Sequence, residues 1–138
     1  MTRQLFVFTV LVPAAFIYFI YISWPHHWTP LRLVGLILLI SGLLLITIAR
    51  LQLGRSFSIT PQARQLVTHG LYSRIRNPVY LFGHVTILGF LLFLNRPQFL
   101  LIFIVLIPLQ IFRARAEARV LEARFGDQYR QYKSQTWF

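Results

Sequence analysis

Three kinds of residue are scarce or missing in this chain, and each absence excludes a class of protein. Cysteine is absent, so disulfides, thiolate catalysis and cysteine-ligated metal sites are excluded. Only three of the 138 residues are acidic, and charged residues make up 12% of the chain, about half of the roughly 25% usual in soluble domains. Hydrophobic residues make up 57%, too many for a soluble domain of this size to bury and too many for a disordered chain.

Long apolar runs take the place of the missing charges. They predict an all-α integral membrane protein, a single membrane domain over residues 1–138, with transmembrane helices at about 5–24, 33–49, 79–94 and 98–112. The first run has about 20 apolar residues, enough to cross roughly 30 Å of hydrocarbon. The Asn95-Arg96-Pro97 sequence predicts a tight turn, so the last two helices should form an antiparallel hairpin.

Basic residues are abundant and give the chain a net charge of +11. Such a charge is typical either of nucleic-acid binding or of a membrane protein with a basic cytoplasmic face. The basic residues lie between and after the apolar runs, which favours the membrane and argues against a nucleic-acid partner. Only Arg32 and Arg96 fall on the opposite side, so both termini are predicted to be cytoplasmic. A polar segment at 51–78 should lie along the cytoplasmic interface.

The residues with reactive side chains are concentrated in two stretches, 69–80 and 113–132. The predicted hairpin would bring both stretches to the same face of the membrane, which indicates a site there. In the second stretch Glu117, Leu121 and Phe125 recur at the spacing of one helical face, which predicts an amphipathic C-terminal helix that ends at Gly126.

Both stretches carry patterns that point to a known family. The segment LVTHGLYSRIRNPVY resembles the first hallmark of the isoprenylcysteine carboxyl methyltransferase and phospholipid methyltransferase superfamily, and RARAEARVLEARFGDQYRQY resembles the second. The resemblance covers about residues 50–135. It implies an integral membrane enzyme that transfers a methyl group from S-adenosylmethionine, leaving S-adenosylhomocysteine, to a lipidic or small hydrophobic acceptor. It leaves the acceptor and the oligomeric state open.

The resemblance also implies roles for individual residues. Arg76 and Glu117 correspond to the residues important for catalysis. The cofactor-binding positions implied are His69, Gly70, Leu71, Tyr72, Asn77, Pro78, Tyr80, Arg113 and Glu117. The sequence departs from the pattern at two site positions, and the usual closing proline stretch does not follow Trp137 and Phe138. Asn77 replaces a histidine, a change expected in some bacterial relatives, and Ala118 replaces the second of two glutamates. The expected location is a bacterial or archaeal cytoplasmic membrane.

The chemistry of these side chains agrees with such a cofactor. The Glu117 carboxylate suits a cation or a hydroxyl group, and arginine suits a carboxylate through bidentate hydrogen bonds. Tyr72 and Tyr80 offer aromatic faces to a cation. A structural alternative is an ion pair between Glu117 and Arg113, one helical turn away.

Histidine leaves two further questions. His84 lies inside the third apolar run, where it would line a substrate tunnel or bond to a neighbouring helix. No metal site is predicted, because the neighbours of His26 and His27 do not supply further ligands at a metal-binding spacing.

Two other functions are compatible with parts of the sequence. Membrane reductases that use NADPH share a related C-terminal pattern, but their glutamate after the His-Pro-Asn-Tyr stretch has no counterpart here. A non-catalytic basic membrane protein that binds anionic lipid or a partner is the other alternative, and Ala118 is the residue that favours it.

Overall fold

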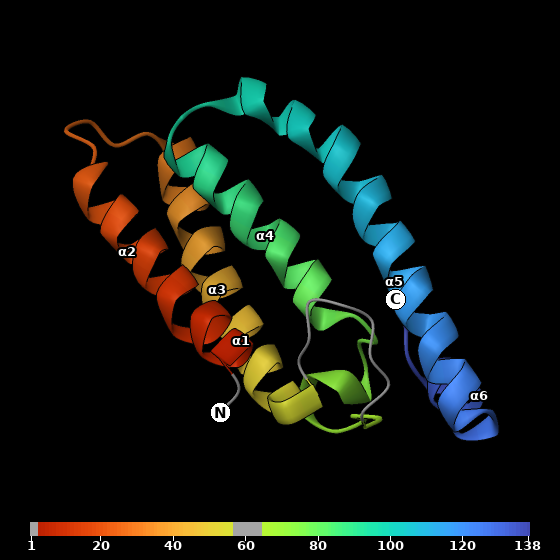
Figure 1. Cartoon of the computed structure of the whole chain (residues 1–138). Coiled ribbons are helices and arrows are strands. Elements are labelled where there is room, and N and C mark those ends of the chain that lie inside the picture. Colours follow the sequence, from red (N-terminus) through yellow and green to blue (C-terminus); the bar gives the residue numbers. More distant parts are fainter. Residues whose placement is uncertain (1–2, 57–64) are drawn as a thin grey trace.

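The computed structural model describes residues 3–56 and 65–138, and every regular element in those ranges is helical (Figure 1). The all-α prediction is therefore confirmed. The elements are α1 (Arg3–Phe6), the π-helical η1 (Val7–Leu11), α2 (Val12–Ile22), α3 (Pro30–Leu53), the 3₁₀ turns η2 (Gly54–Ser56) and η3 (Gly70–Ser73), α4 (Pro78–Phe93), the 3₁₀ helix η4 (Pro97–Ile102), α5 (Phe103–Phe125) and α6 (Asp127–Gln135).

Three helical stretches in the described ranges are long and apolar enough to cross a membrane: Arg3–Ile22, Pro30–Leu53 and Pro97–Phe125. A fourth apolar helix, α4, is shorter, with 16 residues. The predicted run at 98–112 has no boundary at Arg113, because α5 continues to Phe125 through alanine, arginine, glutamate and leucine, all good helix formers. Gly126 ends it at a positive φ of 52°, as the sequence predicts.

The second span begins earlier and ends later than its apolar run at 33–49. Its start is set by capping, because Thr29 Oγ1 accepts a hydrogen bond from the Arg32 backbone N–H at 3.3 Å and Pro30 occupies the first helical position. At its other end the helix continues to Leu53 and stops before Gly54, which has a φ of 52°. Arg50 is thereby placed inside the last turn of α3.

Glycines bring α3 and α4 into close contact. A Cβ atom added to Gly89 would lie 2.3 Å from the backbone nitrogen of Leu39, and one added to Gly35 would lie 2.3 Å from that of Phe93. Gly42 meets Thr86 in the same way. The backbones can approach this closely only because these three positions lack side chains, as is common between membrane helices.

The α4–α5 hairpin follows the predicted turn. Asn95 adopts a φ of 57°, and its N–H donates to the Leu92 carbonyl at 2.9 Å. The α5 helix then runs back along α4 and continues past the start of α4 to reach α6 (Figure 1). The hairpin thus carries the second polar stretch to the end of the bundle where α1, η3 and α6 lie, which we call the basic end.

The described part of the predicted interfacial segment contains the last residues of α3 and the 3₁₀ turns η2 and η3 at the basic end. Residues 57–64, part of that prediction, lie outside the described residues. After them, Val67 and Tyr72 pack with Ala49 into a small hydrophobic cluster, against which Leu53 and Val79 also lie. This cluster anchors η3 on the end of α3.

Candidate active site

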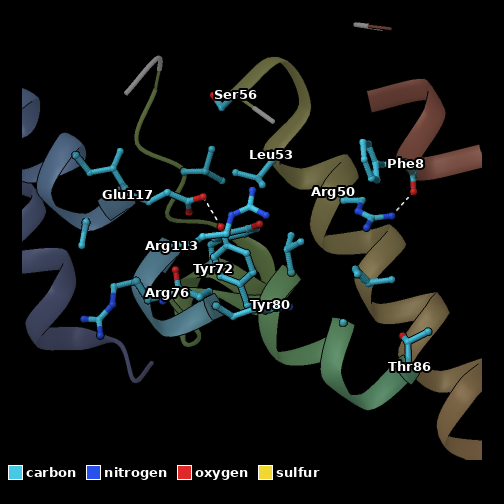
Figure 2. A pocket seen from close by; sticks show the side chains of 18 of the residues that line it. Phe8, Arg50, Leu53, Ser56, Tyr72, Arg76, Tyr80, Thr86, Arg113 and Glu117 are labelled. Atoms are coloured by element: carbon cyan, nitrogen blue, oxygen red, sulfur yellow. Dashed lines mark hydrogen bonds between the residues drawn. The ribbon is translucent and has the colours of Figure 1, made fainter. Parts of the chain in front are cut away.

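A cavity of about 420 Å³ lies among the helices at the basic end (Figure 2). Apolar residues of η1, α2, α3 and α4 form one part of its wall, among them Phe8, Phe16 and Ile46. Polar side chains from both predicted stretches form another part. Six of the predicted site residues line the cavity: Tyr72, Arg76, Asn77, Tyr80, Arg113 and Glu117.

Tyr80 and Glu117 join the two stretches directly. The Tyr80 hydroxyl, on α4, donates a hydrogen bond to Oε1 of Glu117, on α5, although the residues are 37 positions apart. Arg113 lies one turn before Glu117 and interacts electrostatically with both side chains. The carboxylate is therefore held at the cavity wall by a tyrosine as well as by the arginine that the sequence suggested as its partner.

Tyr72 places a buried hydroxyl in the cavity wall. Its side chain is 6% exposed, and its Oη atom has no hydrogen-bond partner among the described residues. Burial raises the pKa of Tyr72, with smaller contributions from Tyr132 and Glu117, so the hydroxyl stays protonated. A buried hydroxyl without a partner is costly. A ligand atom that accepts its hydrogen bond would remove that cost.

The three residues before Tyr72 do not line the cavity. Gly70 has a φ of 61°, and a Cβ there would lie 2.3 Å from the Gln52 side-chain amide. The Leu71 N–H donates to Gln52 Oε1 at 2.9 Å, and the Tyr72 N–H donates to the His69 carbonyl. His69, Gly70 and Leu71 thus shape η3 against α3 and hold Tyr72 in place.

The segment from Arg74 to Asn77 is paired with the C-terminal residues. The Arg76 N–H donates to the Trp137 carbonyl at 3.1 Å, the Asn77 N–H donates to the Phe138 carbonyl at 2.7 Å, and the Trp137 N–H returns a hydrogen bond to the Arg74 carbonyl. A parallel bridge joins Ile75 to Trp137. This pairing fixes the backbone from which Arg76 and Asn77 extend.

The side chains of this segment have different surroundings. The Arg76 guanidinium reaches toward α6, where Nη1 donates to the Lys133 carbonyl at 3.5 Å. Asn77 lines the cavity and its side chain does not cap α4. Pro78 is fully buried at the first position of α4, outside the cavity lining. Its part in the site is to fix the start of the helix that carries Tyr80.

A family model for phospholipid methyltransferases matches residues 30–128, which include the first polar stretch, the second as far as residue 128, and most of the cavity wall. The chain belongs to the phospholipid methyltransferase family. A search of the curated proteins found no match. Together with the apolar helices, the family indicates a membrane methyltransferase. It therefore favours this activity over the NADPH-dependent reductase.

His84 lies apart from the cavity of this methyltransferase family member. Its Nδ1 atom is 2.8 Å from the Tyr80 carbonyl, and its ring stacks on Phe103 with the ring centroids 5.6 Å apart. The Nε2 atom is buried and has no hydrogen-bond partner among the described residues. His84 is therefore outside the cavity lining; its ring stacks on the neighbouring helix, while its Nδ1 contact is to a carbonyl of its own helix.

Several lining residues were not predicted as site residues. Tyr129 and Tyr132 of α6 are buried beside the cavity, and the Tyr132 hydroxyl donates to the Tyr72 carbonyl at 2.7 Å. Both tyrosines lie in the second sequence pattern, which could have identified them. Gln110 lines the cavity with a buried Oε1 atom that has no partner in the described part of the chain. Gln110 lies three residues before Arg113 and seven before Glu117, and this helical spacing could have identified it.

Proposed function

We propose that this protein is an S-adenosylmethionine-dependent methyltransferase that acts at the cytoplasmic membrane surface on a lipidic or small hydrophobic acceptor. The observation that carries the proposal is the cavity, which unites the Tyr80–Glu117 pair with an apolar wall formed by membrane-spanning helices. Such a cavity suits two ligands of different polarity. An acceptor like that of the isoprenylcysteine carboxyl methyltransferases is one member of the proposed class.

The residues present fit the cofactor. The Glu117 carboxylate offers a partner for an ammonium group or a ribose hydroxyl, and Arg113 offers one for a carboxylate. The buried hydroxyl of Tyr72 and the Oε1 atom of Gln110 supply a donor and an acceptor that the described residues do not satisfy. Arg76, Asn77 and the ring of Tyr80 complete the polar wall.

Held by these residues, S-adenosylmethionine would supply the methyl group to the acceptor's lone pair, and its sulfur would keep the electron pair of the broken C–S bond. The protein's task in such a displacement is alignment and exclusion of water. Tyr80 holds the Glu117 carboxylate in one orientation, and the C-terminal pairing holds the backbone of Arg76 and Asn77. Glu117 can accept a proton from an acceptor that must lose one, and an anionic acceptor needs no base.

The test is calorimetric titration of the purified protein with S-adenosylhomocysteine, with NADPH titrated in parallel. We expect micromolar affinity for S-adenosylhomocysteine alone. The Glu117→Gln variant keeps an oxygen for the Tyr80 hydrogen bond and removes the charge. We expect its affinity and turnover to fall about 100-fold, since a buried charged partner is lost. Glu122→Gln is the matched control, because Glu122 pairs with the exposed Arg130 on the protein surface. Equal loss in both variants would remove Glu117 from the site.

The non-catalytic alternative is supported by one observation. Ala118 lines the cavity at the position of the second family glutamate, so the wall lacks that carboxylate. If a folded sample binds neither S-adenosylhomocysteine nor NADPH but binds anionic vesicles in a salt-sensitive manner, this alternative replaces the methyltransferase proposal.

A further inference from the structure

Arg50 occupies an unusual place for a basic residue at the end of a membrane helix. It lies three residues before the end of α3, where long basic side chains commonly extend to lipid head groups. Its side chain instead turns inward, is 8% exposed and lines the cavity. Its position in the sequence indicates only a basic residue at the interface, whereas the structure places its charge within the candidate active site.

A π-helical segment holds Arg50 in this orientation. Nη1 of Arg50 donates a hydrogen bond to the Phe8 carbonyl, and the guanidinium lies 5.3 Å from the centre of the Phe8 ring (Figure 2). Phe8 belongs to η1, where the helix adopts π geometry. π-helical turns are rare overall, and those that occur are often found at functional sites. The contact fixes a planar group of five N–H donors against the cavity wall.

The charges that line the cavity are unbalanced. Arginines 50, 76 and 113 line it, and Glu117 is the single acidic residue among the described lining residues. Figure 2 shows Glu117 and Arg113 on the α5 side and Arg50 on the α3 side. The proposed cofactor brings two positive groups and one negative group. An occupied cavity therefore keeps an excess of positive charge, which a second ligand with a negative group would offset.

Apolar side chains share the cavity lining with Arg50. Phe8 lies against its guanidinium, and the cavity is also lined by Leu43, Ile46 and Leu53 of α3 and by Val12 and Phe16 of α2. Tyr72, which interacts with Arg50 electrostatically, is a polar neighbour. A ligand bound there would place an anionic group at the guanidinium and an apolar chain along the apolar residues. Planar oxyanions such as carboxylates, and phosphates, match the donor arrangement of arginine.

We propose that Arg50 is the residue that binds the anionic group, a carboxylate or a phosphate, of the methyl acceptor. This inference rests on the proposed function, because it assigns the apolar side of the cavity to the acceptor. It adds Arg50 as a residue that selects the acceptor by charge.

The experiment measures binding of three probes of equal chain length to the purified full-length chain in neutral-detergent micelles. The probes are decanoate, decyl phosphate and decanol, and S-adenosylhomocysteine is titrated separately. We expect the wild-type protein to bind one or both anions about 10- to 100-fold more tightly than decanol, the range of a hydrogen bond to a charged group. The anion that binds more tightly distinguishes a carboxylate acceptor from a phosphate-bearing one. Equal affinity for all three probes overturns the proposal without any variant.

Variants then assign the preference to the residue. Arg50→Gln should lose the preference for anions, while its affinity for S-adenosylhomocysteine stays within about twofold of the wild type. Arg50→Lys keeps the charge without the planar donor arrangement and should retain part of the preference. Arg119→Gln, which removes an exposed arginine on α5 outside the cavity lining, is the matched control and should bind all probes like the wild type.

The outcomes separate this inference from the proposed function. If Arg50→Gln keeps the anion preference, or if it loses cofactor affinity as strongly as anion affinity, the assignment of Arg50 to the acceptor is overturned. If the wild-type protein prefers the anions, loses that preference on Arg50→Gln and never binds S-adenosylhomocysteine, the anion site is supported and the methyltransferase proposal fails.

Discussion

Helices α3 and α4 are held together differently from helices α5 and α6, which we call the arm. Seven residues of α3 are buried, and its glycines bring its backbone against that of α4. In α5 the buried residue is Ala114 alone among those described. The arm is instead joined to the rest by polar contacts, from Glu117 to Tyr80 and from Tyr132 to Tyr72.

This difference teaches where the chemistry can lie. Gly35, Gly42 and Gly89 bring α3 and α4 into backbone contact, whereas a Cβ added to Gly83, which lines the cavity, would lie at an ordinary packing distance of 3.7 Å from Ile46 Cδ1. The arm lines the cavity through long side chains, among them Arg113, Glu117 and Tyr132. The rigid pair positions Tyr80 and Arg50, and the arm brings Glu117 to them.

The largest effect is expected from a substitution at Gly89, in the contact between α3 and α4. Leucine at this position would force a Cβ atom to 2.3 Å from the α3 backbone, so we expect Gly89→Leu to prevent accumulation of folded protein. Gly83→Ala is the matched control, because its Cβ would meet ordinary packing distances, and its melting temperature should stay close to the wild type. Size-exclusion chromatography and thermal melting in detergent measure both. A folded, equally stable Gly89→Leu protein would show that the α3–α4 contact is not the rigid part.

The hydrogen bond between Tyr80 and Glu117 tests the arm. Tyr80→Phe removes a donor to a charged acceptor, and we expect a loss of about 1.5–3 kcal/mol in unfolding free energy. The affinity for S-adenosylhomocysteine should fall with it, because the carboxylate loses its orientation. Tyr21→Phe, at a residue 78% exposed, serves as the control. Unchanged stability and affinity would mean that the arm is held by other contacts.

Substitution of Tyr132 should have a smaller effect on stability, and this effect should also depend on pH. Tyr132→Phe removes its hydrogen bond to the Tyr72 carbonyl, and we expect a loss of about 0.5–1.5 kcal/mol near neutral pH. Burial, and next the nearby Tyr129, raise the pKa of Tyr132 from 10.0 to about 12. The unfolded chain therefore loses this proton first, and stability falls as the pH rises from about 10 to 12.

Melting temperatures measured across that range should decline less steeply for Tyr132→Phe than for the wild type. An identical decline in both proteins would show that Tyr132 does not contribute to the pH dependence of stability.

The smallest effect is expected at the surface of the arm. Arg130 pairs with Glu122 at 3.0 Å and with Asp127 at 2.9 Å, and its side chain is 64% exposed. Exposed ion pairs contribute little to stability because water and salt screen them. Arg130→Ala should melt within experimental error of the wild type at 0.15 M salt. A clear drop would indicate that the turn at Gly126 depends on this network.

Much of the framework could be predicted from local sequence. The apolar runs predict the helices, Asn95 and Gly126 predict the turn and the helix end, and the two motifs identify the polar stretches that meet in the cavity. The helix bounds were less predictable, since the cap at Thr29 and the helix-forming residues after Arg113 extend helices beyond their apolar runs. The prediction that both termini are cytoplasmic stays a prediction. The chain has no cysteine, so single-cysteine labelling can test it directly.

The direction of individual side chains could not be predicted. In the sequence, Arg50 is one of many basic residues at an interface. In the structure it lines the cavity, where its guanidinium donates a hydrogen bond to the Phe8 carbonyl of η1. His69, Gly70 and Leu71 were predicted to bind the cofactor; they do not line the cavity, and Gly70 and Leu71 contact Gln52. The pairing of the C-terminal residues with the Arg74–Asn77 segment had no sequence signal.

The sequence by itself determined that this protein is helical, membrane-embedded and a family member with two polar stretches, because hydropathy, capping and turn chemistry act over a few neighbouring residues. Only the tertiary structure decided which side chains share the cavity. Tyr80 and Glu117 are 37 positions apart, and Tyr72 and Tyr132 are 60 apart. Contacts over such separations depend on how whole helices pack, and the glycines that allow α3 and α4 to touch set that packing.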